Sequence, residues 1–249
     1  MILKFMIFII LISHVNLYAK ELKVAFSPST PPYVFKNGTG ITMDIINESL
    51  AVKGHTLKPV FVSIGRGFEL FKDGYIDATT IIKKSSGLKA FYSDYFMQYH
   101  NAVFALKSNH YTIHSLLELS DYYMIGFQNA HKYLGEKFGK VTQKAGNRYS
   151  EIADQRRQVL KLLKGHTDIV VMDRHIFKFY KQQLIAEGKV PKDIQTTLYE
   201  LFSPTKYRVS FKDKALLNDF NTGLRKLKKS GRYDKIYHYY SNQYFKVKK

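Results

Sequence analysis

The sequence predicts an α/β protein built from two similar lobes. An early strand-helix-strand pattern runs over residues 21–62, and its connection is long enough to join two parallel strands. A helix end, a glycine, an aspartate turn and a short strand follow over residues 70–82, and the same order returns over residues 162–173. Repetition of one unit favours two lobes, and the space between two lobes is where a small ligand usually binds.

The first 19 residues have the pattern of a secretory signal peptide. One positive residue, Lys4, precedes an apolar run over residues 5–12, and Ala19 is a small residue at a plausible cleavage point. The alternative is an uncleaved membrane anchor, but the run is shorter than the roughly 20 apolar residues of a membrane span. We therefore expect export, with cleavage near Ala19.

The composition is that of a globular protein. The chain has 249 residues, of which 45% are hydrophobic, enough for the core of one domain or of two small ones. It has no cysteine, which excludes disulfides, thiolate metal sites and a cysteine nucleophile. The formal charge is +19, and loss of Lys4 with the signal peptide leaves +18. Such a charge suits a nucleic acid, an anionic membrane surface or an acidic ligand, although scattered lysines are usually only solvated.

The first lobe is predicted to have a small parallel sheet. Its elements are, in order, a strand at 21–26, a helix from 41 to 50, a strand at 57–62, a short helix that ends at Gly74, and a strand at 78–82. Three prolines keep the loop from Ser27 to Tyr33 out of regular structure. Ligands of such sheets meet the loops at the carboxyl ends of the strands, here residues 27–33, 63–66 and 79–84.

A second lobe is predicted to be inserted into the first. Its elements are a short helix near 116–119, a strand at 123–127, a helix near 133–138, a helix from Ile152 to Gly165, a strand at 168–172 and a helix from Ile176 to Gly188. A strand at 207–211, a helix of about 17 residues ending near Gly231 and an aromatic-rich last helix then complete the first lobe. With passages between the sheets near 107 and 204, we assign residues 20–106 and 205–249 to lobe 1 and residues 107–204 to lobe 2.

Several short motifs occur in an order that resembles a known family. They are Pro31-Pro32-Tyr33, Gly40-Ile41-Thr42-Met43-Asp44, Gly74-x-x-Asp77, Tyr92-Ser93-Asp94-Tyr95, Gly165-x-x-Asp168 with Asp173, and Gly231-x-x-x-x-Ile236-Tyr237. The chain resembles the extracellular solute-binding proteins of family 3, the periplasmic receptors of amino-acid-type ABC importers. The resemblance implies a type II periplasmic-binding-protein-like fold with two hinge crossovers, a monomer that closes around a small ligand, and an ABC transporter membrane subunit as partner.

The sequence departs from that family at two ligand positions. The arginine that usually grips the α-carboxylate of an amino acid would fall among Ser86, Gly87 and Leu88, and no arginine occurs between Arg66 and Arg148. Ile64 stands where the family often has an aromatic residue. The expected ligand is therefore a small polar compound, anionic or amino-acid-like.

The candidate ligand-binding residues lie in loops after strands. Arg66 is either an anion clamp or a surface arginine at the start of a helix, and Lys83, Lys84 and Lys89 are poorer candidates for that charge. Asp173 matches the family's aspartate that receives a ligand amino group, and it also suits the N-cap of the next helix. The full set is Ser27, Tyr33, Arg66, Thr79, Thr80, Gln128, Asn129 and Asp173.

The remaining candidates differ in the role that we expect. Gln128, Asn129 and Ala130 precede a helix, so their backbone N–H groups suit an anionic end of a ligand. Asp77 and Asp168 each follow a glycine that ends a helix, and we expect them to stabilise the turn rather than to bind.

No catalytic or metal motif stands out. His110 and His114 have the spacing of a helical pair, but no third ligand lies nearby and neither HExxH, Gly-x-Ser-x-Gly nor a phosphate loop occurs. We therefore expect no catalysis, no metal, no cofactor and no nucleic-acid partner. The alternatives are a periplasmic enzyme on the same fold, such as a dehydratase, or a ligand sensor. Because the chain ends soon after the last predicted helix, we expect no fused kinase or cyclase.

Overall fold

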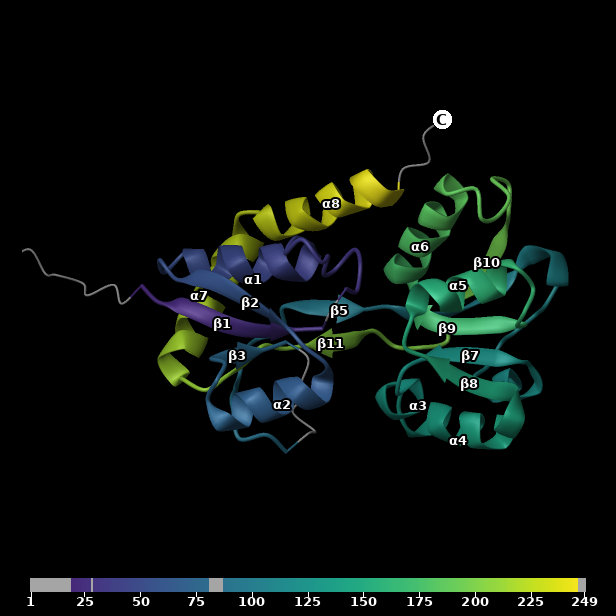
Figure 1. The fold of residues 1–249 in the computed structure, drawn as a ribbon, viewed down its shortest axis with the longest axis horizontal. Helices are drawn as coiled ribbons and strands as arrows, with labels where there is room; N and C mark the ends of the chain where they lie inside the picture. Colours follow the sequence, from purple (N-terminus) through teal and green to yellow (C-terminus); the bar gives the residue numbers. More distant parts are fainter. Residues whose placement is uncertain (1–18, 28, 81–86, 246–249) are drawn as a thin grey trace, which may run out of the picture.

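The computed structural model describes residues 19–27, 29–80 and 87–245, except the side chains of Ile64 and of residues 241–245. Two α/β lobes lie side by side and are joined by a pair of short strands (Figure 1). The predicted fold class is confirmed. The expected signal peptide, up to residue 18, lies outside these residues. Among the helices described, none is both long and apolar enough to cross a membrane.

The sheet of lobe 1 contains the predicted strand-helix-strand unit. Its order is β2 (Thr56–Phe61), β1 (Glu21–Phe26), β3 (Ala78–Thr79), β12 (Ser210–Phe211) and β4 (Phe91–Tyr92). β1 is parallel to β2 and β3, whereas β12 is antiparallel to its neighbours β3 and β4. Of the strand expected at 78–82, β3 covers Ala78 and Thr79, Thr80 lies in a bend, and residues 81 and 82 lie outside the described part of the chain. The carboxyl ends of β1 and β3 point toward lobe 2 (Figure 1).

Helices cover both faces of this sheet. α1 (Ile41–Ala51), α7 (Lys214–Lys229) and α8 (Arg232–Phe245) lie on one face, and α2 (Ile64–Asp73) lies on the other (Figure 1). α1 and α7 pack closely, because a Cβ on Gly223 would stand only 1.8 Å from the carbonyl oxygen of Ser49. α2 ends at Gly74, whose φ of 87° is the left-handed conformation that glycine adopts readily.

The sheet of lobe 2 has five strands. Its order is β10 (Thr196–Tyr199), β6 (Asn101–Leu106), β9 (Ile169–Asp173), β7 (Met124–Phe127) and β8 (Tyr149–Ile152). The expected boundary left residues 101–106 in lobe 1, but β6 pairs with β9 and β10 in this second sheet. The first passage between the sheets therefore comes before Asn101, and the other domain bounds stay a prediction. The 3-10 helix Leu117–Asp121 occupies the position of the predicted short helix.

Lobe 2 has four α-helices among the described residues, and one of them, α5, begins later than we expected. They are α3 (Ala130–Tyr133), α4 (Glu136–Ala145), α5 (Gln155–Leu163) and α6 (Arg174–Ala186). We expected Ile152 in the helix that ends at Gly165, but it ends β8, and Asp154 caps α5 by accepting the N–H of Arg157. A side-chain cap of this kind defines where a helix starts.

Two short strands connect the lobes. β5 (Met97–Tyr99) pairs antiparallel with β11 (Thr205–Tyr207), with Tyr99 opposite Thr205 and Met97 opposite Tyr207. The predicted strand 207–211 is thus divided: its first residue belongs to this hinge pair and its last two belong to β12. Because successive side chains of a strand point to opposite faces, the hinge pair presents one set of residues to each side.

Candidate functional site

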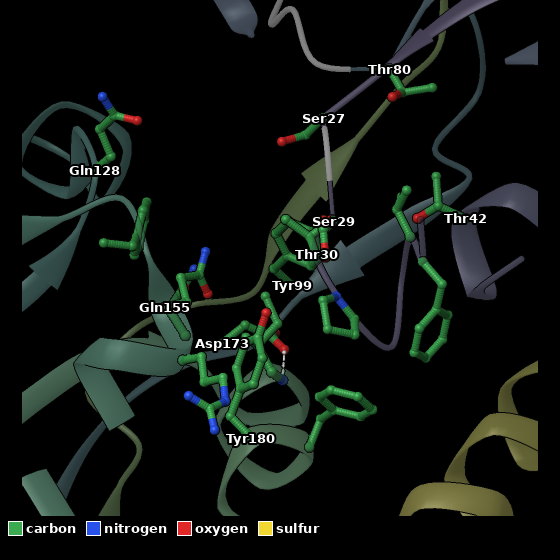
Figure 2. A pocket seen from close by; sticks show the side chains of 18 of the residues that line it. Ser27, Ser29, Thr30, Thr42, Thr80, Tyr99, Gln128, Gln155, Asp173 and Tyr180 are labelled. Carbon is green, nitrogen blue, oxygen red and sulfur yellow. Dashed lines mark hydrogen bonds between the residues drawn. The ribbon is translucent and has the colours of Figure 1, made fainter. Parts of the chain in front are cut away.

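A cavity of about 890 Å³ lies between the lobes. Figure 2 shows that Ser27 and Thr80 approach it from lobe 1 and Gln128 from the opposite side. Aromatic side chains form much of its wall, namely Phe35, Phe96, Tyr99, Phe127, Tyr133, Phe179, Tyr180 and Tyr207. A concave site with apolar walls and a few polar groups is typical of small-molecule binding.

Asp173 is the most buried ionisable group that lines the cavity. It ends β9 and caps α6: its Oδ1 accepts the N–H groups of His175 at 2.8 Å and Ile176 at 3.2 Å. Its Oδ2 accepts the N–H of His100 at 2.7 Å, and only 2% of the residue is exposed. Burial raises the pKa of Asp173 to about 6, although these hydrogen bonds oppose the change. Asp173 therefore acts as the N-cap of α6, and its carboxylate also lines the cavity.

Tyr33 joins the first lobe to this carboxylate. Its hydroxyl donates to Oδ1 of Asp173 at 3.1 Å, and its side chain is fully buried. Burial, with the nearby charge of Asp173, raises the pKa of Tyr33 well above its usual value, so the hydroxyl stays a donor. The Tyr33 ring packs 4.5 Å from that of Tyr99, and Tyr99 packs 4.9 Å from Tyr207, both distances between ring centroids. These three rings fill the space beside the hinge strands.

The cavity brings together half of the predicted ligand-binding residues. Ser27, Thr80, Gln128 and Asp173 line it, whereas Tyr33, Arg66, Thr79 and Asn129 lie outside the set of described lining residues. Thr80 also donates from its hydroxyl to the carbonyl of Ala25 at 3.0 Å. A part in binding stays a prediction for all eight.

Arg66 lies on the surface, at the start of α2. Its guanidinium pairs with Glu69 at 3.2 Å, one turn further along the helix, and both side chains are more than half exposed. Its backbone N–H donates to the Ser63 hydroxyl that caps the helix. Arg66 thus lies on the surface. The anion-clamp hypothesis is tested by the ligand affinity of Arg66→Ala, and an affinity equal to that of the wild type would contradict it.

A carboxylate of lobe 2 occupies amides that we expected to face a ligand. Glu151, at the end of β8, accepts the N–H of Asn129 at 2.7 Å and of His131 at 3.1 Å. It also accepts from the Tyr149 hydroxyl at 2.6 Å and lies 2.6 Å from His131 Nδ1. Burial alone would raise the pKa of Glu151, but these hydrogen bonds outweigh it and hold the pKa below its usual value. An anionic ligand would have to displace Glu151 to reach the Asn129 amide, and a contact of that amide with a ligand stays a prediction.

The aspartates expected to be structural do stabilise turns. Asp77 accepts the N–H of Lys23 at 2.9 Å and pairs with the ammonium of Lys20 at 2.7 Å. Asp168 accepts the N–H of Tyr123 at 2.8 Å and the hydroxyl of Tyr111 at 2.9 Å. Each carboxylate thereby connects the turn before a strand to another segment of the same lobe.

Sequence reasoning missed the aromatic side of the site. The tyrosines fell mostly at core spacing, yet Tyr99, Tyr180 and Tyr207 line the cavity. One signal was available on α6, where Ile176, Tyr180 and Gln183 follow Asp173 at spacings of three, seven and ten residues and share its face of the helix. These side chains line the cavity together with Asp173.

Metal coordination finds no support in the described side chains. No group of three or more histidine, aspartate or glutamate residues there could hold an ion. Arg156 is the one arginine among the described lining residues, and its guanidinium pairs with Glu187. The cavity therefore offers one buried carboxylate, the exposed Lys36, hydroxyl and amide groups, and aromatic faces.

Comparison with known proteins shows the family and the fold. The family of bacterial extracellular solute-binding proteins, family 3, matches residues 22–243, while no curated protein matches the chain. An ancestral arginine-binding protein bound to arginine has a TM-score of 0.69 at 22% identity, covering 93% of this chain and 100% of that one. The GluR0 ligand-binding core with L-glutamate has a TM-score of 0.71 at 15% identity, covering 92% and 100%.

A third solved structure comes from a transport system. An ABC uptake transporter substrate-binding protein from Streptococcus pneumoniae with bound histidine has a TM-score of 0.68 at 17% identity, covering 90% of this chain and 92% of that one. At such identities the structures show the shared two-lobed fold, and the family match covers nearly all of the described residues. The chain belongs to the bacterial extracellular solute-binding proteins, family 3.

Proposed function

We propose that the protein captures a small, amino-acid-like solute in the cavity between its lobes and delivers it to the membrane subunit of an ABC importer. The observation that carries this proposal is Asp173, a buried carboxylate that lines an interlobe cavity with aromatic walls. Export to the periplasm, action as a monomer and closure of the two lobes around the ligand belong to the same proposal.

The cavity favours a ligand with an amino or other cationic group. Asp173 accepts four hydrogen bonds, three of them on Oδ1 and one on Oδ2, which leaves Oδ2 with capacity for a further donor. A cation placed there would also face aromatic rings, which attract positive charge. The solved structures described above contain arginine, histidine and glutamate, so an α-amino group is common to the ligands of these proteins.

A purely anionic ligand has less support. Of the arginines considered, Arg66 lies on the surface and Arg156 is paired with Glu187. In lobe 2, Glu151 takes the backbone donor of Asn129 that we expected to serve an anion. A carboxylate of an amino acid would therefore be bound by neutral donors such as Ser27, Thr80 and Gln128, whose side chains line the cavity, with the exposed Lys36 as the one lysine among the described lining residues.

The test is a ligand screen by thermal shift, followed by titration calorimetry of each hit. The panel contains L-arginine, L-lysine, L-histidine, L-glutamine, L-glutamate, simple amines and organic acids. We expect an amino compound to raise the melting temperature, and Asp173→Asn to weaken its binding by about tenfold or more, since a charged hydrogen bond is lost. Asp213→Asn is the matched control, because Asp213 caps α7 in the same way but on the surface.

The outcomes separate the alternatives. Stabilisation by organic acids alone, with no effect of Asp173→Asn, would support the anionic ligand and contradict the role of Asp173. NMR spectra of each hit, recorded during incubation with the protein, show whether it is consumed. Turnover would support the enzyme alternative, whereas an unchanged ligand agrees with capture. Loss of uptake of the ligand in cells that lack the protein would distinguish import from sensing.

A further inference from the structure

A second, smaller cavity lies at the hinge, and its lining differs from that of the ligand cavity. Its volume is about 500 Å³, and its walls come from the hinge strands, from α7 and α8 of lobe 1, and from the start of α6 in lobe 2. Figure 1 shows where these elements lie in the fold. The lining residues are Tyr95, Met97, Gln98, His100, Arg174, His175, Lys206, Lys228, Tyr233, Asp234 and Tyr237. A volume of this size has room for a small organic molecule, since one water occupies about 30 Å³ of liquid.

The two cavities lie on opposite faces of the hinge strands. Tyr99, Thr205 and Tyr207 line the ligand cavity and their neighbours Gln98 and Lys206 line the second one, while Met97 borders both. This division follows from the alternation of side chains along a strand. A molecule in the second cavity would therefore contact both lobes and the hinge without entering the ligand cavity.

Cationic side chains dominate the charge of the second cavity. Its lining contains three permanent cations, Arg174, Lys206 and Lys228, against one carboxylate, Asp234. Glu200 lies beside the cavity and pairs with Arg174 at 3.2 Å, so it offsets part of that one charge. An excess of positive charge remains, and it is concentrated where two lobes and a hinge meet.

The contacts of the lysines leave donors for a ligand. The Lys228 ammonium donates to the carbonyl oxygen of Tyr95 at 2.7 Å, a neutral acceptor that leaves two of its three N–H groups for other partners. The Lys206 ammonium stands 5.6 Å from the centroid of the Tyr95 ring. Both cations therefore lie over or beside Tyr95, and neither of these two contacts neutralises a charge, although the carboxylate of Asp94 also attracts the Lys228 ammonium.

Neutral donors complete the lining. Gln98 and His100 come from the hinge, with Gln98 Nε2 2.9 Å from His100 Nε2, and His175 comes from the start of α6. The N–H groups of this helix start are already used, because Arg174 donates to the carbonyl of His100 and His175 donates to Asp173. The side chains of Gln98 and His100, not the helix amides, are the neutral groups offered to a ligand.

We infer that this cavity is a second binding site, for a small multivalent anion such as a tricarboxylate or a phosphate. Lys206, Lys228 and Arg174 supply charged hydrogen bonds from three different segments, and such bonds are roughly twice as strong as neutral ones. The site goes beyond the proposed function and does not depend on it, because it uses neither Asp173 nor the aromatic wall of the ligand cavity.

The test is calorimetric titration of the full protein with citrate and, separately, with inorganic phosphate, in about 0.15 M NaCl to screen diffuse attraction. We expect one anion per chain to bind saturably. Lys206→Met and Lys228→Met should each weaken binding by about tenfold or more, because each removes a charged hydrogen bond. Lys229→Met is the matched control: Lys229 neighbours Lys228 in α7, is exposed and is not among the described lining residues.

Three results would overturn the inference. They are the absence of saturable binding of either anion at millimolar concentration, unchanged affinity in both Lys206→Met and Lys228→Met, and an equal loss in Lys229→Met, which would indicate attraction by surface charge. Circular dichroism checks that each variant folds, and Lys206→Met carries the test if Lys228→Met does not fold. Failure here leaves the amino-acid screen untouched, since its ligands and variants are different.

Discussion

Replacement of Asp173 by asparagine is expected to change how the stability of the protein depends on pH. Burial raises the pKa of this carboxyl in the folded protein to about 6, whereas an unfolded aspartate titrates near its ordinary value of about 4. For an acid whose pKa is raised by folding, the folded state holds the proton more tightly. The contribution of Asp173 to stability is therefore greatest at pH values below the pKa of the unfolded state. It is lost as the pH rises through the pKa of the folded state.

The size of this effect follows from the difference between the two pKa values. A difference of about two units corresponds to about 3 kcal/mol between fully protonated and fully ionised Asp173, at 1.36 kcal/mol per unit. Between about pH 4.5 and about pH 7.5, roughly 2 kcal/mol of that difference should be seen. An asparagine side chain does not titrate, so the stability of the wild type relative to Asp173→Asn should fall by this amount as the pH rises.

Urea unfolding at a series of pH values measures the difference directly. Subtraction of the two curves removes the titration of all other groups that the substitution leaves unchanged. Asp213→Asn serves as the control, because it alters a surface cap of the same kind on α7. A wild-type advantage that stays constant with pH, or that grows as the pH rises, would refute the reasoning that burial dominates the pKa of Asp173.

Three further substitutions and one control test hydrogen bonds near the site and the packing of lobe 1. Tyr33→Phe removes one donor to a buried carboxylate and should lower the free energy of unfolding by about 1.5–3 kcal/mol in urea titrations; an unchanged value would contradict the contact. Gly223→Ala should cost about 1–3 kcal/mol or more in the same assay, since its Cβ would stand 1.8 Å from the Ser49 oxygen, whereas Gly65→Ala, in a helix with open space around it, should be neutral or slightly stabilising. Glu151→Gln should lower the free energy of unfolding at neutral pH. Because the pKa of Glu151 is lowered in the folded state, the difference in stability between wild type and variant should shrink as the pH falls through the carboxyl range. A difference in stability that is greater in acid would contradict this expectation.

The order of the elements in lobe 1 could be predicted because local signals agree with the tertiary structure there. Gly74 ends α2 in a left-handed conformation, and β1 and β2 form the parallel pair that the long connection between them implied. Signals of this kind act within a few residues along the chain. They place the loops that carry Ser27 and Thr80 at the edge of the sheet where the cavity lies.

Assignment of strands to sheets could not be predicted as well. β6 is apolar and follows the first-lobe turn directly, so its sequence suits either sheet, and only its pairing with β9 and β10 puts it in lobe 2. The run from Tyr207 to Phe211 likewise reads as one strand but divides between the hinge and the sheet of lobe 1. Pairing is decided by contacts between distant segments, which no local pattern encodes.

The sequence by itself determined the two-lobed α/β fold, the family motifs and the positions of Ser27, Thr80, Gln128 and Asp173 at loops that face the cavity. Only the tertiary structure decided the environment of each candidate. It placed Arg66 on the surface, filled the Asn129 amide with Glu151, and surrounded Asp173 with donors that include Tyr33, 140 residues away along the chain. The physical reason is that hydrogen bonding and burial depend on which atoms meet in space, and these partners come from strands and loops that folding alone brings together.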